Sequence, residues 1–192
     1  MAKPKTFISI GHYPKRSGAV NTIYGLTEHH EAKKIVNVFF THIITPQSLY
    51  SYIPVKSGPL KEKVAFINKE ANEGSIAVEI HFNASDSRKA QGIETLFFPG
   101  STQGKRLAGS IQQALLDLLP FKDRGIKERN NLYFLKATVI PAIIAEVLFI
   151  DNDQEASYLF YPRSHLLIAN ALFRGIEKHI TEYLSLEREE KQ

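Results

Sequence analysis

The chain has 192 residues, 43% of them hydrophobic and 23% charged, and this composition predicts one globular domain with a substantial core. It contains no cysteine, which excludes disulfides and thiolate metal sites. It also has no run of 18 apolar residues, so we expect no membrane insertion. The net charge of +4 permits an anionic partner, but the basic residues are scattered without interleaved aromatics, so we expect no nucleic-acid platform.

Along the chain the pattern alternates between strands and helices. Short apolar runs predict strands at 5–11, 49–55, 76–82, 92–98, 132–135 and 140–150. Apolar residues recurring every three or four positions predict helices at 27–42, 59–73, 103–119, 154–160 and 164–186. Thr27 is the expected N-cap of the first helix, and the charged tail 187–192 is expected to fray. Such alternation predicts a single α/β domain whose mainly parallel sheet is covered on both faces.

The strand expected at 76–82 has two chemically different faces. One face is wholly apolar, and the other carries Glu79, His81 and Asn83 in a row. A core does not accept these groups without partners, so the face is a natural place for a metal ligand or a proton-transfer group. His12 follows the strand at 5–11 in the same way. Open α/β sheets bind ligands at this end of their strands.

Glu28 is expected to point inward from the start of the first helix. It lies on the same stripe as Ala32 and Ile35 and has no lysine or arginine three or four residues further on. Glu31, in contrast, has Lys34 at i+3 and is interpreted as a surface carboxylate. An inward carboxylate needs a partner, and a cation would serve.

Glu146 interrupts the apolar run 141–150, which suits a strand buried on both faces. Desolvation at such a place raises the pKa of a carboxyl group. A general base that works near neutral pH needs this environment.

Two histidines, a carboxylate and water make a catalytic zinc site. Zinc lowers the pKa of bound water to ~7 and polarises a carbonyl, while a nearby carboxylate relays the proton. Each of the four residues can also be explained by a structural role alone. The two histidines could be polar residues with hydrogen-bond partners, Glu28 a helix-start carboxylate, and Glu146 a carboxylate paired across the sheet. Four separate explanations are less economical than one site. His29 and His30 are expected to flank Glu28 on the polar side of the helix, and either remains an alternative to Glu28 as ligand. The other histidines, His42, His165 and His179, are expected to be solvated.

Several segments together resemble the zinc-dependent N-acetylmuramoyl-L-alanine amidases of the amidase-3 type, especially the catalytic domains of clostridial-phage endolysins. The matching segments occur in family order from residue 6 to about 178 and include Gly11-His12, Ser17-Gly18-Ala19, the stretch 25–28, Ile80-His81-Phe82-Asn83-Ala84, 92–98, 124–127 and the Pro-Ala-x-x-x-Glu element at 141–146. The resemblance implies a twisted, mainly parallel six-stranded sheet flanked by helices, with the catalytic domain over 1–186.

The resemblance further implies Zn²⁺ ligands at His12, Glu28 and His81, with Glu146 as the catalytic carboxylate. The implied reaction cleaves the amide between N-acetylmuramic acid and L-alanine of the stem peptide in bacterial peptidoglycan. Glu79 is expected to orient His81 as a partner outside the ligand set.

Other residues concern the substrate groove. Asn83 is a further candidate beside His81, and Arg124, Lys127 and Arg129 are candidates to line an anionic-glycan groove or a solvated loop. Three features depart from the family pattern: Tyr13 replaces a glycine common after the first histidine, the Thr-Arg-Asp element common after the second strand is missing, and Lys63 stands where a helix arginine is frequent.

The start of the chain lacks a signal-peptide core, so we expect synthesis in the bacterial cytoplasm and action at the cell wall after release, by a holin-type exit if the chain is a phage lysin. No cell-wall-binding module is visible, and the pattern sets no oligomeric state. Three alternatives remain at this point: a zinc peptidase that cuts within the stem peptide, a non-catalytic wall-binding domain, and a basic nucleic-acid-binding protein.

Overall fold

The structure, a computed structural model, describes residues 3–45 and 47–189. Its strands are β1 (Lys5–Ile10), β2 (Val20–Asn21), β3 (Leu26–Thr27), β4 (Ser51–Pro54), β5 (Ile76–Asn83), β6 (Ile93–Phe97), β7 (Asp123–Glu128) and β8 (Ala142–Phe149). Its helices are α1 (Glu28–Val38), which continues as the π-helical η1 (Phe39–Ile43), α2 (Leu60–Glu70), α3 (Thr102–Leu118), α4 (Tyr133–Ala137), α5 (Asp153–Ser157), which continues as the 3₁₀ turn η2 (Tyr158–Phe160), and α6 (Ser164–Glu189).

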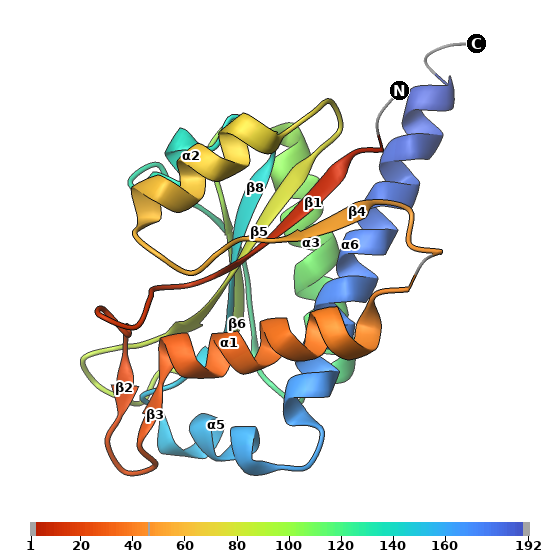
Figure 1. The fold of residues 1–192 in the computed structure, drawn as a ribbon. Helices are drawn as coiled ribbons and strands as arrows, with labels where there is room; N and C mark the ends of the chain where they lie inside the picture. Colours follow the sequence, from red (N-terminus) through yellow and green to blue (C-terminus); the bar gives the residue numbers. More distant parts are fainter. Residues whose placement is uncertain (1–2, 46, 190–192) are drawn as a thin grey trace.

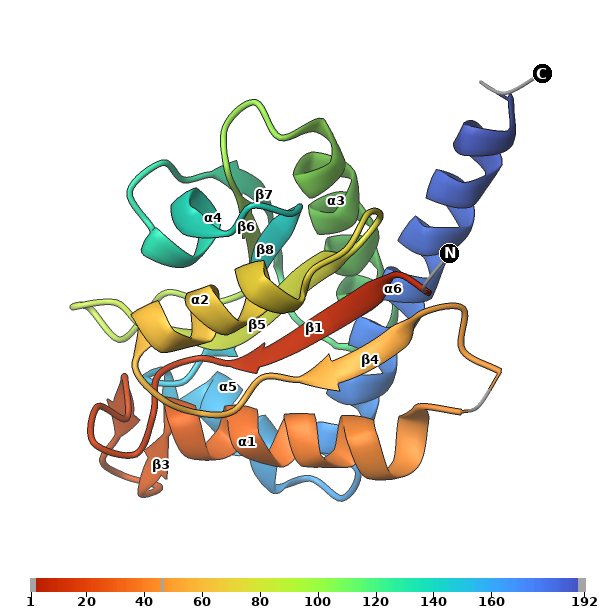
Figure 2. The same ribbon diagram turned by 45° about the horizontal axis from the view of Figure 1, so that its top comes forward.

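Six strands form one twisted sheet in the order β4-β1-β5-β8-β6-β7 (Figures 1 and 2). The first four run parallel, while β6 pairs antiparallel with β8 and parallel with β7. The short β4 lies at an edge, where Pro54 removes no ladder hydrogen bond inside the sheet. The prediction of a mainly parallel six-stranded α/β sheet is confirmed.

Helices cover both faces of the sheet, as predicted. Figure 2 shows α2 and α4 on one side, with α1, α3 and α6 on the other. The α1/α3/α6 side encloses the larger apolar core, and the α2/α4 side encloses a smaller one around Phe7, Ile67 and Phe134. Glu79 pairs with Ile144 and shares a face with Ala77, so the polar face of β5 looks toward the smaller core.

The strand predicted at 132–135 is wrong. These residues lead into the helix α4, and the sixth strand is β7 instead. A short apolar run does not by itself separate a strand from a buried helix turn, and Phe134 and Leu135 pack against the sheet from α4. The edge strand β7 was missed because it pairs only with β6 and has just one large apolar residue, Ile126.

Some boundaries also differ from the prediction. The helix expected at 59–73 ends at Glu70, and Gly74 lies in the following turn with φ +76°. The last helix continues through Glu189, three residues beyond its predicted end, and residues 190–192 of the tail expected to fray lie outside the described part of the chain. Among the described helices, none is both long and apolar enough to cross a bilayer.

The segment expected to be a loop after His12 contains the β2–β3 hairpin, which leads directly into α1. Asn21 anchors this hairpin, because its buried amide donates to the carbonyl of Ile150 (3.1 Å) and to Asp153 (2.9 Å). Its side-chain oxygen accepts from the backbone of Ile23 and Tyr24 (both 3.0 Å). The hairpin thereby fixes where α1 begins.

Candidate metal centre

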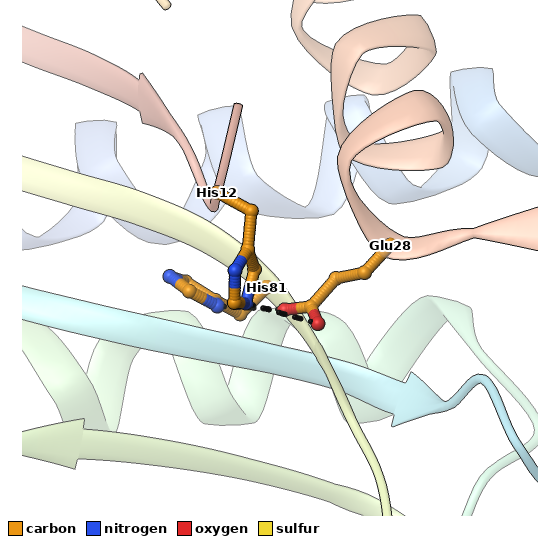
Figure 3. Close-up of side chains that lie close together, drawn as sticks. All are labelled: His12, Glu28 and His81. Atoms are coloured by element: carbon orange, nitrogen blue, oxygen red, sulfur yellow. Dashed lines mark hydrogen bonds and ion pairs between the residues drawn. The ribbon is translucent and has the colours of Figure 1, made fainter. Parts of the chain in front are cut away.

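Three elements bring His12, Glu28 and His81 together (Figure 3). His12 follows β1, Glu28 is the first residue of α1, and His81 lies near the end of β5. One donor atom from each residue lies within 4.8 Å of the others. His12 Nε2 is 3.1 Å from Glu28 Oε2, and His81 Nδ1 is 2.7 Å from Glu28 Oε1. The structure therefore assembles the predicted set, while the role of these residues as ligands stays a prediction.

The backbone at this site is shaped to let the rings approach. His12 has φ +59°, a conformation that is uncommon for a residue with a side chain and concentrated at functional sites. Gly18 has φ +78°, and a Cβ there would lie 2.4 Å from Glu28 Oε2 and 2.6 Å from the His12 ring. A Cβ at Gly11 would lie 2.8 Å from the His81 ring. Both glycines are therefore part of the site.

The carboxylate of Glu28 is strongly favoured over its protonated form. Burial alone would raise the pKa of Glu28, but hydrogen bonds with His12 and His81 outweigh burial and lower the pKa to about 2. Burial would likewise lower the pKa of His81, but its contacts with Glu28 and Glu79 raise the pKa well above the ordinary value. Glu28 is thus ionised and keeps a cation beside it, which is the proton-bearing ring of His81 or, in its place, a metal ion.

The residues fit a zinc ion. A catalytic zinc site uses imidazole nitrogens and carboxylate oxygens, with a position left for water or substrate. His81 meets a carboxylate at each ring nitrogen, Glu28 at Nδ1 (2.7 Å) and Glu79 at Nε2 (3.0 Å). The ring donates at both nitrogens only as an imidazolium, and once it is neutral it has one N–H, so the contact at the other nitrogen needs a cation. A divalent ion at Nδ1 would supply it.

Glu79 contacts His81 as the sequence predicted. It is buried, and besides His81 Nε2 it accepts from Ser9 Oγ (2.9 Å) and from the ammonium of Lys63. Burial would raise the pKa of Glu79, but the contacts with His81 and Lys63 lower it to about 2. Sequence reasoning noted Lys63 only as a departure from the family, although its position four residues before the buried Ile67 already places it on the inner stripe of α2.

Glu146 lies directly beside His81. The two residues are register partners between β8 and β5, and Glu94 of β6 is the partner of Glu146 on its other side. The Oε2 atom of Glu146 is buried and has no hydrogen-bond partner among the described residues. Burial raises the pKa of Glu146 to about 7, with the charge of His81 opposing and those of Glu28 and Glu94 adding to the rise.

Two basic residues of β7 lie beside Glu94, at the end of the row that His81, Glu146 and Glu94 form across β5, β8 and β6. Arg124 donates from Nε to Glu94 Oε2 (2.6 Å) and stacks 4.9 Å from the ring centroid of Phe149. Lys127 donates to the same oxygen of Glu94. Both side chains are about one-third exposed, so they can also contact a ligand. Arg129, named with them in the sequence prediction, is exposed: its guanidinium donates to the carbonyl of Glu128 (3.1 Å) and its backbone N–H to the carbonyl of Phe97.

Asn83 and His29 do not join the three-residue cluster. A register shift follows His81 in β5, and the side-chain oxygen of Asn83 accepts from the backbone of Ala84 (2.9 Å). His29 is buried, contrary to its predicted place on the polar side, and its Nδ1 lies 3.3 Å from the carbonyl of Gly11. His30 is exposed. Neither alternative to Glu28 is brought to the other two donors.

Three further predictions about charged groups are wrong. Glu31 is buried rather than on the surface, because α6 packs over that side of α1 and His165 contacts its carboxylate at 2.8 Å. His165 is therefore paired, not solvated. His179 is 3% exposed, and its burial lowers its pKa to about 4. His42 is exposed as predicted.

The comparison with protein families agrees with this geometry. The amidase-3 family model, described as N-acetylmuramoyl-L-alanine amidase, matches residues 6–178. A relative by sequence is the germination-specific N-acetylmuramoyl-L-alanine amidase of Bacillus subtilis, which is 27% identical over 139 residues. The match covers 72% of this chain and 58% of that protein, so the chain spans little more than half of the relative.

Solved structures with the same fold include amidase and endolysin domains. The catalytic domain of CwlV, an N-acetylmuramoyl-L-alanine amidase from Bacillus (Paenibacillus) polymyxa var. colistinus, has a TM-score of 0.76 and 27% identity, covering 95% of this chain and 98% of that one. The catalytic domain of an endolysin targeting Clostridia difficile has a TM-score of 0.76 and 22% identity, covering 91% and 97%. The second likeness concerns the fold alone. The predicted resemblance is confirmed.

Proposed function

The chain belongs to the N-acetylmuramoyl-L-alanine amidase family, and from this premise we propose that it hydrolyses bacterial peptidoglycan. The bond cleaved is the amide between the lactyl group of N-acetylmuramic acid and L-alanine of the stem peptide. One observation carries the proposal: Glu146, with an unpartnered carboxylate oxygen, lies beside a cluster of two imidazoles and a carboxylate.

In this proposal His12, Glu28 and His81 hold Zn²⁺. When bound, zinc supplies positive charge that polarises the amide carbonyl and acidifies a water molecule. Glu28 contributes a negative charge that its two histidine contacts keep in place. Glu79 holds His81 from the far side of its ring.

Glu146 acts as the general base. Its pKa of about 7 leaves a substantial carboxylate fraction at neutral pH while keeping it basic enough to take a proton. Glu146 Oε2 removes the proton from the attacking water and then delivers it to the nitrogen of the departing L-alanine. Because this oxygen has no partner among the described residues, no existing hydrogen bond needs to break first.

Arg124 and Lys127 bind the substrate in this proposal. Together with Glu94 they carry a net positive charge at the partly exposed end of the row that contains Glu146. The stem peptide carries carboxylates, which guanidinium and ammonium groups recognise. Asn83, at the end of β5, is a further candidate for contact with the substrate.

The proposed place of action is the bacterial cell wall. Sequence similarity to the endolysin of Bacillus phage SPP1, 29% identical over 189 residues, supports a lysin role, in which a phage or prophage product degrades the wall. The fold serves wall amidases from several sources, so it fits a chromosomal enzyme equally well.

Product analysis tests the proposal. Purified protein is incubated with a cell-wall suspension, before and after chelation and after zinc is added back. We expect turbidity to fall only with zinc, and new L-alanine amino termini to appear without shortened peptides. A zinc peptidase would expose other amino termini, whereas a non-catalytic module would bind walls and release nothing. Salt-sensitive DNA binding that the chelator does not change would favour a nucleic-acid-binding protein.

A further inference from the structure

Lys63 is a buried lysine for which the mechanism above has no use. It lies on α2, and its side chain is 2% exposed. Burying an ammonium group is unfavourable unless acceptors surround it. Its Nζ donates to the carbonyl of Ile10 (2.7 Å) and to Glu79 Oε1. Lys63 thereby joins the strand that leads to His12 with the strand that carries His81.

The hydrogen bonds of Glu79 determine which nitrogen of His81 carries a proton. Glu79 Oε1 accepts from Lys63 and from Ser9 Oγ (2.9 Å), and Oε2 lies 3.0 Å from His81 Nε2. An ionised carboxylate only accepts, so Nε2 must donate. The neutral ring then keeps its lone pair on Nδ1, the atom that faces Glu28 at 2.7 Å. A metal ion binds a lone pair.

We propose that Lys63 is a positioning residue for the metal centre. Through Glu79 it fixes the Nε2–H tautomer of His81 and leaves Nδ1 available to zinc. The inference rests on the proposed zinc site but not on the reaction. Lys63 acts by saturating Glu79 Oε1, which leaves Oε2 as the acceptor for His81. Lys63 donates to none of the three proposed ligand side chains, so its effect on the ring of His81 passes through Glu79.

Glu79→Gln tests the relay, because the substitution keeps the shape and changes one acceptor into a donor. Lys63 and Ser9 both donate to the first oxygen, so the new amide oxygen stays with them and the NH₂ group faces His81. The ring must then accept at Nε2 and carry its proton on Nδ1. We expect zinc affinity to fall about 100-fold, the upper end for the loss of such a partner.

Removing Lys63 from that variant separates the relay from simple damage. In the double variant Lys63→Met/Glu79→Gln the amide is free to turn its oxygen toward His81. We expect the double variant to bind zinc about tenfold more tightly than Glu79→Gln alone. It also removes both members of the buried ion pair, so no unpaired buried charge opposes folding.

Two single variants serve as controls. Lys63→Arg keeps the donors, and we expect the parental tautomer and a zinc affinity within about threefold of the parent. Lys5→Met removes another lysine between β1 and α2, which contacts Glu70 Oε2 at 3.2 Å, and we expect no change in zinc affinity.

Zinc affinity is measured on the zinc-loaded protein by competition with a chelator and without substrate. Nitrogen-15 NMR of the histidine rings reports which nitrogen of His81 carries hydrogen. A double variant that binds zinc no better than Glu79→Gln, or a parent whose His81 carries its hydrogen on Nδ1, would overturn the proposal. If the parent binds zinc and shows the expected tautomer but releases no L-alanine termini, the proposed function fails and the role of Lys63 stands.

Discussion

Glu79 and Glu146 both lie beside His81, the first two residues before it on β5 and the second opposite it on β8. Burial acts on both, yet their pKa values are about 2 and about 7. Glu79 has three partners, Ser9, Lys63 and His81, which stabilise its charge. The Oε2 atom of Glu146 has none among the described residues. Donors rather than depth therefore separate Glu79, whose charge is stabilised, from Glu146, whose pKa suits the proton transfer that we propose for it.

The largest expected effect comes from Glu146→Gln, which removes the base and keeps the shape. We expect the rate of wall hydrolysis to fall by roughly 100- to 10,000-fold, the usual contribution of a general base. Zinc affinity is expected to stay near that of the parent, because Glu146 is not one of the three clustered donors. Measured turbidity loss and zinc affinity together check this. Hydrolysis at the parental rate would remove the contrast between the two carboxylates.

His179 shows the effect of burial on a group that is positively charged when protonated. Its pKa is about 4 in the folded chain because burial disfavours the charged ring, against an ordinary value of 6.5. The unfolded chain binds more protons between these values, so the free energy of unfolding falls as the pH drops from about 6.5 to 4. The full loss is roughly 3 kcal/mol.

Denaturant unfolding at several pH values measures this loss. His179→Leu removes the titrating group, so its stability is expected to fall less steeply over the same range. Parallel pH profiles for the parent and for His179→Leu would contradict the assignment.

Gly18→Ala tests the close packing around two of the proposed metal ligands, His12 and Glu28. The added Cβ would meet Glu28 Oε2 at 2.4 Å and the ring of His12 at 2.6 Å. We expect zinc affinity to fall at least about tenfold, as for other changes just outside a metal's ligands. Gly100→Ala is the matched control, since Gly100 has nearly the same φ, +79°, and nothing within 4 Å of its added Cβ. An equal loss in both variants would mean that backbone strain, not contact with the ligands, is responsible.

The smallest effect is expected for the basic residues that contact Glu94. Lys127→Met removes one of the two cations beside Glu94, and we expect KM to rise about fivefold with kcat nearly unchanged, the pattern of lost substrate binding. Lys122→Met changes an exposed lysine just before β7 and is expected to change neither constant. A fall in kcat for Lys127→Met, with KM unchanged, would place Lys127 in the chemistry instead.

Much of this arrangement was predictable from sequence, and the failures have physical causes. The alternating faces of β5 and the apolar run around Glu146 identified both carboxylates, because single strands and helices carry their own periodicity. Periodicity does not report what packs from another element. Burial of Glu31 by α6 and of Lys63 by the strand ends was therefore missed.

The edge strand β7 and the hairpin before α1 were missed for a related reason. Both are short or polar, and their positions depend on partners far along the chain, such as Asn21 with Ile150. The close approach of Gly18 to Glu28 and His12 also left no signal in the local sequence, since a glycine in a polar segment predicts only a turn.

The most direct test of the whole account is the zinc stoichiometry of the parent beside His12→Ala, His81→Ala and Glu146→Gln. The account predicts one tightly held zinc per chain in the parent and in Glu146→Gln, and severe loss in both histidine variants. Undiminished zinc in the folded histidine variants would contradict it, because the ion would then lie elsewhere and Glu146 would have no metal centre to serve.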